Sequence, residues 1–141
     1  MNFDKAQKFS QQANERNDCT VKAISIACDV PYKVAHKALA NEGRKPRCGS
    51  YRHQQARAIK ALGFDLEPIK VTAKTMVKLK SDTAVDTGYF LAYVSGHVAA
   101  VVNGKIEDWT DGRRHRIQTV CKITPTATRK QRKQMMKELF Q

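Results

Sequence analysis

Apolar positions recur at helical spacing from residue 19 onwards, whereas the first 17 residues are polar and predict no buried element. One face of the segment 19–29 is apolar, which predicts a buried helix. Asp18 is a favourable N-cap residue, so Cys19 is expected at the first helical position. The apolar residues of this face are Val21, Ile24, Ala27 and Cys28.

Two more helices are predicted before residue 63. Pro31 favours a helix start, and the segment 32–41 follows it as far as Gly43, a residue type common at helix ends. A third helix is expected at 54–62. The stretch between these two helices is basic and contains Pro and Gly, which predicts a loop.

After residue 63 the pattern changes to short apolar runs, which are typical of strands. Asn103-Gly104 separates two of these runs and is a strong signal for a two-residue hairpin turn. A short helix is expected at 72–79 and a basic helix at 128–141. Helices followed by an antiparallel sheet predict an α+β domain. The predicted strands are 64–71, 88–94, 98–102, 105–109 and 116–123.

The chain length and composition fit one folded domain. It has 141 residues, of which 41% are hydrophobic, enough to build a core of this size. No apolar run approaches the roughly 18 residues that a membrane-spanning helix needs. The polar N-terminus lacks the apolar segment of a secretory signal. We therefore expect a cytoplasmic protein that does not associate with membranes.

The charge is basic and unevenly distributed. There are 26 Lys and Arg residues against 13 Asp and Glu, a net charge of +13, and more than half of the excess follows residue 112. Such a charge favours an anionic partner, either nucleic acid or an acidic protein surface. We expect a domain at 1–124 and a basic helical tail at 125–141. The candidate contacts to an anionic partner are Arg113, Arg114, Arg116, Arg129, Lys130, Arg132 and Lys133.

A disulfide framework is not expected for the four cysteines, because the sequence shows no secretory signal. A zinc site is not expected, because no C-x-x-C pair or Cys/His cluster has suitable spacing. We expect no metal and no cofactor. Cys28 falls on an apolar helix face and is expected in the core. Cys19 differs, because free amides and the macrodipole at a helix start favour the reactive thiolate. The neighbouring Asp18 opposes this effect as a like charge.

The hairpin places a histidine and an aspartate together. A two-residue turn pairs Val102 with Lys105, and this register puts His97 and Asp108 on one face as diagonal neighbours. A base and a group that orients it are what a cysteine nucleophile needs. The alternative is an edge hairpin whose His and Asp side chains face solvent.

Three short motifs resemble the papain-like cysteine peptidase superfamily. They are Asn-Asp-Cys-Thr at 17–20, Ser-Gly-His-Val at 95–98 and Ile-Glu-Asp-Trp at 106–109. The chain most resembles small bacterial and bacteriophage members related to the peptidases that trim bacteriocin leaders. The resemblance covers about residues 14–123 and implies a papain-like fold, in which a helical half with the Cys helix packs on an antiparallel sheet. For a phage-encoded chain, the expected location is the host cytoplasm.

The resemblance also implies roles for individual residues. Cys19 would be the nucleophile, His97 the general base and then general acid, and Asp108 the group that orients the imidazole. These residues follow the family's chain order of Cys, His and Asp.

The family places a Gln about six residues before the Cys, where its amide helps to form the oxyanion hole. Ala13 occupies that position here, so the candidate side chains are Gln12, Asn14 and Asn17. The backbone amide of the nucleophile remains an available donor. In the family an aromatic residue often shields the His–Asp pair, but strand alternation places Trp109 on the opposite face, in the core.

The leading hypothesis is a papain-like cysteine peptidase or related thiol hydrolase. It would cut or transfer an amide-type bond through an acyl-enzyme, with a host or phage protein, or an acidic peptide, as substrate. Two alternatives remain open on the same scaffold: a basic nucleic-acid-binding protein, and a protein that binds a host factor. His36, His53 and His115 are expected to be packed or solvated residues without a catalytic role.

Overall fold

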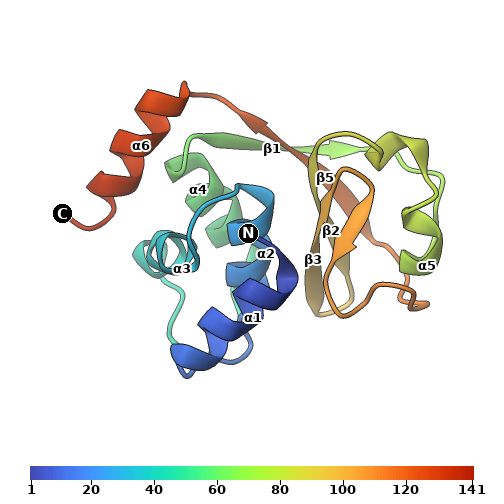
Figure 1. The fold of residues 1–141 in the computed structure, drawn as a ribbon, viewed down its shortest axis with the longest axis horizontal. Coiled ribbons are helices and arrows are strands. Elements are labelled where there is room, and N and C mark those ends of the chain that lie inside the picture. Colours follow the sequence, from blue (N-terminus) through green and yellow to red (C-terminus); the bar gives the residue numbers. More distant parts are fainter.

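The computed structural model describes all 141 residues and divides them into a helical half and a sheet half (Figure 1). The helices are α1 (Phe3–Gln12), α2 (Cys19–Ala27), α3 (Tyr32–Asn41), α4 (Arg52–Ala61), α5 (Met76–Leu79), the 3₁₀ turn η1 (Thr83–Val85) and α6 (Arg129–Glu138). The strands are β1 (Phe64–Ile69), β2 (Tyr89–Val94), β3 (His97–Val102), β4 (Lys105–Glu107) and β5 (Thr119–Pro125). This arrangement confirms the predicted α+β class.

The five strands form one antiparallel sheet in the order β1-β5-β2-β3-β4. β3 and β4 are joined at Asn103-Gly104, where φ is +48° and +79°. Two consecutive positive φ values are typical of a type I′ turn, whose twist matches that of the strands. Val102 pairs with Lys105, so the register predicted for the hairpin is confirmed.

Both faces of the sheet are covered, which explains why β2 is buried along almost its whole length. One face packs on the N-terminal helices, and the other packs on α5 and η1 (Figure 1). The residues of β2 and β3 that face the N-terminal helices are Leu91, Tyr93, Val98 and Ala100. Those that join the second core are Phe90, Ala92, Val94, Ala99 and Val101.

The central helix α2 lies against β3 and is flanked by α1 and α3. It is apolar on most of its surface, as expected of a helix surrounded by other elements. Cys19 is its first residue, as predicted, and Asp18 occupies the N-cap position without making a side-chain capping hydrogen bond. The Asp18 carboxylate instead accepts a hydrogen bond from Tyr32 Oη at 2.7 Å and lies 3.5 Å from Lys22 Nζ.

The C-terminal helix α6 is docked on the helical half, at the end of the molecule opposite α5 (Figure 1). Leu139 is buried in the main core, and Met136 packs against it. The Arg132 guanidinium lies 5.0 Å from the centre of the Phe64 ring, and its Nη1 donates to Ala127 O. No helix of the protein is long and apolar enough to span a membrane.

The sequence prediction missed α1, because most of its residues are polar and its fully buried residues, Ala6 and Ser10, are small. The predicted strand at 105–109 is too long: β4 ends at Glu107, and a turn follows. Because β4 ends at Glu107, strand alternation does not set the direction of the Asp108 and Trp109 side chains.

Candidate active site

Cys19 is a partly buried thiol at the start of α2. The first amides of a helix have no partner within the helix. The Cys19 N–H also has no backbone partner outside the helix. Burial opposes ionisation of the thiol. The neighbouring His97 imidazole and the Val98 N–H favour the thiolate, outweigh burial and lower the pKa of Cys19 from its usual 9.0.

His97 begins β3 and interacts with both Cys19 and Asp108. Its Nε2 lies 2.8 Å from Asp108 Oδ2, so Nδ1 is the ring nitrogen left for the thiol. Burial lowers the pKa of His97. The hydrogen bonds and charges of Asp108 and Cys19 outweigh that effect and raise the pKa from 6.5 to about 9. The sequence-based pairing of His97 with Asp108 is therefore present in the structure.

The two pKa shifts have opposite signs and favour one charge state of the pair. A lowered thiol pKa and a raised imidazole pKa favour a Cys19 thiolate beside a His97 imidazolium. Such a pair is the reactive form of a catalytic cysteine. The nearby Asp18 carboxylate would oppose the thiolate, but its hydrogen bond from Tyr32 and its proximity to Lys22 offset part of its charge.

Asp108 is held in place by Thr110, a residue that the sequence analysis did not assign to the site. The Thr110 side chain is fully buried, and its Oγ1 donates to Asp108 Oδ2 at 2.7 Å. The Thr110 N–H donates to the same oxygen at 3.1 Å. This is the Asx-type turn that an Asp two residues before a Thr can form, so the Asp-x-Thr spacing contained a usable signal.

Trp109 was predicted in the core, and this prediction is wrong. Its side chain is 49% exposed, and its ring centre lies 5.1 Å from that of His97. The strand alternation used for the prediction does not apply, because β4 ends at Glu107 and the following turn redirects the side chain. Trp109 therefore covers His97, and its other neighbours are His115 at 5.2 Å and the Arg113 guanidinium at 6.0 Å.

The candidate oxyanion side chains are not bonded to the other site residues. Gln12 and Asn14 are exposed, and neither hydrogen-bonds to Cys19. The Asn17 side chain is directed to another loop, where its Nδ2 donates to Arg47 O at 3.1 Å. The Cys19 N–H thus remains as the unpaired donor at the thiol.

A buried chain of polar groups connects the residue after the nucleophile to the sheet. Gln55 Nε2 lies 3.4 Å from Thr20 Oγ1, and Gln55 Oε1 accepts from Tyr93 Oη at 2.9 Å. The Arg52 guanidinium covers the Tyr93 ring at 4.1 Å. Sequence analysis did not find these contacts, because the partners lie more than 30 residues apart and share no motif.

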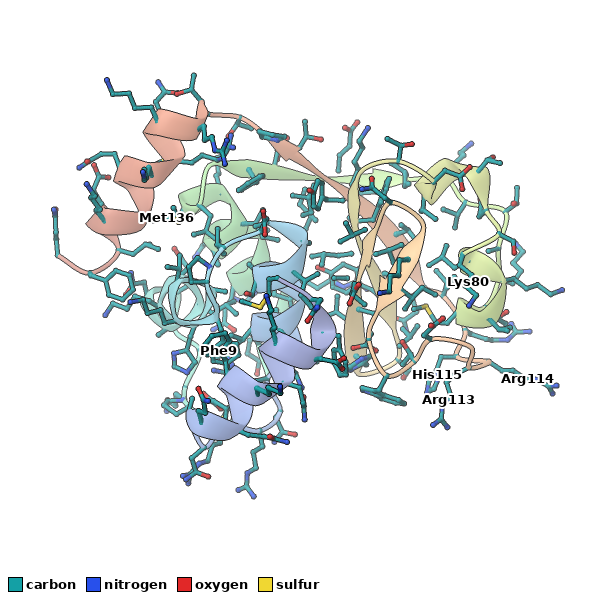
Figure 2. The ribbon with its side chains drawn as sticks, in the orientation of Figure 1. Phe9, Lys80, Arg113, Arg114, His115 and Met136 are labelled. Carbon is teal, nitrogen blue, oxygen red and sulfur yellow. The ribbon has the colours of Figure 1, made fainter.

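The basic residues predicted to contact an anionic partner are split into two groups. Arg113, Arg114 and Arg116 are exposed near Trp109, and Figure 2 places Arg113 and Arg114 at the end of the molecule away from α6. The second group is on α6, where Arg129, Lys130 and Lys133 are exposed. Arg132 is partly buried against Phe64, because its alkyl stem covers the gap beside Gly63.

The other histidines have structural surroundings. His36 Nε2 lies 2.6 Å from Glu15 Oε2, and the ring of the exposed His53 stacks on Tyr51. Cys28 is buried in the core, as predicted, and burial raises its pKa to about 12. No three His, Cys, Asp or Glu side chains are grouped as a metal site would require.

The chain was also compared with known proteins. No family model, no curated protein and no solved structure matches it.

Proposed function

We propose that this protein is a papain-like cysteine peptidase or related thiol hydrolase. Cys19 is the nucleophile, His97 carries the proton, and Asp108 orients the imidazole. One observation carries the proposal: a helix-start thiol interacts with an imidazole whose Nε2 lies 2.8 Å from a buried carboxylate. The chain order of Cys, His and Asp and the helical half before an antiparallel sheet support the papain-like assignment.

In the first step, the Cys19 thiolate attacks the carbonyl carbon of an amide-type bond. The new C–S bond converts the carbonyl oxygen to an oxyanion, which accepts a hydrogen bond from the otherwise unpaired Cys19 N–H. The intermediate collapses as the C–N bond breaks, and the His97 imidazolium gives its proton to the leaving amine. A thioester at Cys19 and a neutral His97 remain.

In the second step, neutral His97 takes a proton from a water molecule that attacks the thioester carbonyl. The C–S bond breaks, the carboxylic acid leaves, and the thiolate–imidazolium pair is restored. Asp108 keeps its hydrogen bond to Nε2 throughout, and Thr110 keeps the carboxylate in position. Asp108 therefore acts on the orientation and charge of the ring and exchanges no proton with the substrate.

The surroundings of the site favour a protein or peptide substrate with acidic residues. The half-exposed Trp109 offers an apolar surface next to His97. The Arg113 guanidinium lies over the Trp109 ring. Arg114 is also exposed in this segment. An acidic side chain close to the scissile bond would meet positive charge here.

Acyl transfer to Cys19 can be tested with p-nitrophenyl acetate, which needs no knowledge of the natural substrate. We expect acetylation of Cys19, mapped by mass spectrometry at neutral pH, at least about tenfold faster than acetylation of Cys48. We also expect the acetyl group to be released on standing, because the second step hydrolyses the thioester. Cys48 is the internal control, since it is exposed and free.

Two variants complete this test. In C19S the fast site should disappear while Cys48 reacts as before. In H97A the reaction at Cys19 should slow markedly. Equal acetylation rates at Cys19 and Cys48 in the unmodified protein, or an acetyl-Cys19 that is as stable as acetyl-Cys48, would contradict the proposed function.

A further inference from the structure

The exposed surface of α6 carries positive charges on one side only. At about 100° of rotation per residue, Arg129, Lys130, Lys133 and Lys137 fall within an arc of about 100°. All four side chains are exposed. We call these four residues the α6 basic face. The side chains between this face and the packed side of the helix include Gln131 and Gln134, which are uncharged.

The adjacent side of α6 is fixed to the domain, so the basic face has a defined direction. Leu139 is buried in the core, Met136 packs against it, and Arg132 lies on the Phe64 ring. In Figure 2 Met136 lies on the side of α6 that faces the helical half. Thr128 caps the helix start with a hydrogen bond from the Gln131 N–H at 3.2 Å. The four cations are therefore held on an ordered helix and not on a flexible tail.

The charges of this face are not neutralised within the protein. None of the ion pairs of the structure involves an α6 residue. The single acid of the helix, Glu138, accepts from Gln134 at 3.5 Å and not from a cation. Four cations along about 12 Å of helix therefore have no counter-ion within the protein and can pair with an external anion of comparable charge density.

We propose that the α6 basic face binds the phosphate backbone of nucleic acid, at a surface separate from the Cys19 site. A duplex presents one negative charge per about 1.7 Å of its axis, which suits a row of cations of this length. Figure 1 places α6 at the end of the molecule away from α5 and the basic segment near Trp109. Binding here would hold the thiol site near a nucleic acid without occupying it.

The packing of α6 favours nucleic acid over an anionic membrane. An interfacial helix binds lipid by inserting its apolar face between headgroups. In α6 that face is already used, because Leu139 and Met136 belong to the protein core. Phe140 is exposed at the end of the helix, but a single aromatic side chain does not replace an apolar face. The contacts left to an external partner are electrostatic.

The test uses the full-length protein and a short fluorescein-labelled DNA duplex of arbitrary sequence, with anisotropy measured at several salt concentrations. The α6 variant R129Q/K130Q/K133Q/K137Q should bind less tightly. Its slope of log affinity against log salt should be shallower by up to about 3.6, since each lost phosphate contact removes about 0.9. Glutamine keeps a high helix propensity, so α6 should remain folded, as circular dichroism can verify.

A charge-matched control removes four exposed cations from the other end of the molecule: K74Q/K78Q/R114Q/R116Q. This control should keep most of the affinity and the salt slope. Duplex binding that is equal in the α6 variant and the unmodified protein, or equally weakened in both variants, would overturn the proposal. Binding of α6 to phosphatidylserine vesicles without any binding to the duplex would overturn it as well.

The proposal does not depend on the thiol chemistry. The α6 variant should acetylate Cys19 at the rate of the unmodified protein, because α6 contributes no residue to that site. Failure of the protein to bind the duplex would thus leave the proposed hydrolase function unaffected. Slow acetylation of Cys19 would likewise leave the proposed nucleic-acid surface unaffected.

Discussion

Two histidines of this protein each bond a buried carboxylate, but their surroundings differ. His36 Nε2 lies 2.6 Å from Glu15, and His97 Nε2 lies 2.8 Å from Asp108. At the first pair, the carboxylate also accepts two hydrogen bonds from the buried Arg44, at 3.1 and 3.2 Å. At the second pair, the imidazole has a thiol, Cys19, as its other partner.

The difference shows that a His–carboxylate pair does not define a catalytic site. Glu15 is neutralised by a fixed cation, so its pair with His36 ties together the loop before α2, α3 and the loop after α3. Asp108 has only uncharged donors from Thr110 besides His97, so its negative charge acts on the imidazole. In the proposed mechanism, the thiol is the third member of a chain of groups through which the proton moves.

The largest expected effect comes from removing each histidine in turn. Without His97, burial of Cys19 raises its pKa without an opposing imidazolium, and few thiols are ionised near pH 6. We expect H97A to slow iodoacetamide alkylation of Cys19 by roughly 100-fold near that pH. H36A should leave the rate within about twofold, because it removes no group that touches the thiol. A similar slowing in both variants would remove the distinction between the two pairs.

Removing each carboxylate should separate stability from reactivity: the loss at Glu15 should lower stability, and the loss at Asp108 should slow the reaction of Cys19. E15Q leaves the buried Arg44 charge without its partner, so the free energy of unfolding should fall by about 3–5 kcal/mol in urea titrations. Alkylation of Cys19 should be almost unchanged. D108N should reduce the free energy of unfolding by only about 1–2 kcal/mol and slow the alkylation instead. The comparison fails if D108N is the more destabilising variant and E15Q the less reactive one.

Acid should expose the contribution of Glu15 to stability. Burial alone would raise its pKa, but the hydrogen bonds from Arg44, His36 and the Arg47 N–H lower it from 4.5 to about 2. A lowered carboxyl pKa contributes stability above pH 4.5 that is lost as the pH falls toward 2. The difference in unfolding free energy between the protein and E15Q should therefore shrink over that range. A difference that stays constant down to pH 2 would show that the Glu15 charge contributes nothing.

The smallest effect is expected at Thr110. T110V keeps the shape and the backbone donor but removes the hydroxyl donor to Asp108, a loss of about 1 kcal/mol. We expect roughly fivefold slower alkylation of Cys19 near pH 6 and recovery in T110S, which restores the hydroxyl. A merely structural role predicts that the pH dependence of alkylation is unchanged in T110V, whereas a positioning role predicts that its midpoint moves to higher pH.

The sequence was sufficient to predict the His97–Asp108 pair because one local signal determines it. Asn103-Gly104 fixes the turn, the turn fixes the register, and the register brings the start of β3 near the end of β4. Asp108 itself lies just beyond β4, where its hydrogen bonds with Thr110 hold the carboxylate beside His97. The start of α2 at Cys19 was likewise predicted from the N-cap position and the apolar face that follows it. Both signals act over fewer than a dozen residues.

Other parts of the site depend on contacts that no local pattern reveals. Trp109 was misplaced because the turn after Glu107 ends the alternation that the strand pattern implied. Glu15 and Arg44 lie 29 residues apart, and only the packing of the helical half brings them together. The basic tail was predicted as a helix, but its docking through Leu139 and Arg132 follows from the position of β5 beside β1.

The proposed charge state of the Cys19–His97 pair depends most directly on the ionisation of His97. An NMR titration of the His97 ring in the unmodified protein and in C19A measures it. We predict a pKa of about 9 in the unmodified protein and a lower value in C19A, since the thiolate is one of the groups that raise it. A pKa near 6.5 in both proteins would contradict the account, because Cys19 and His97 would then not form a thiolate–imidazolium pair at neutral pH.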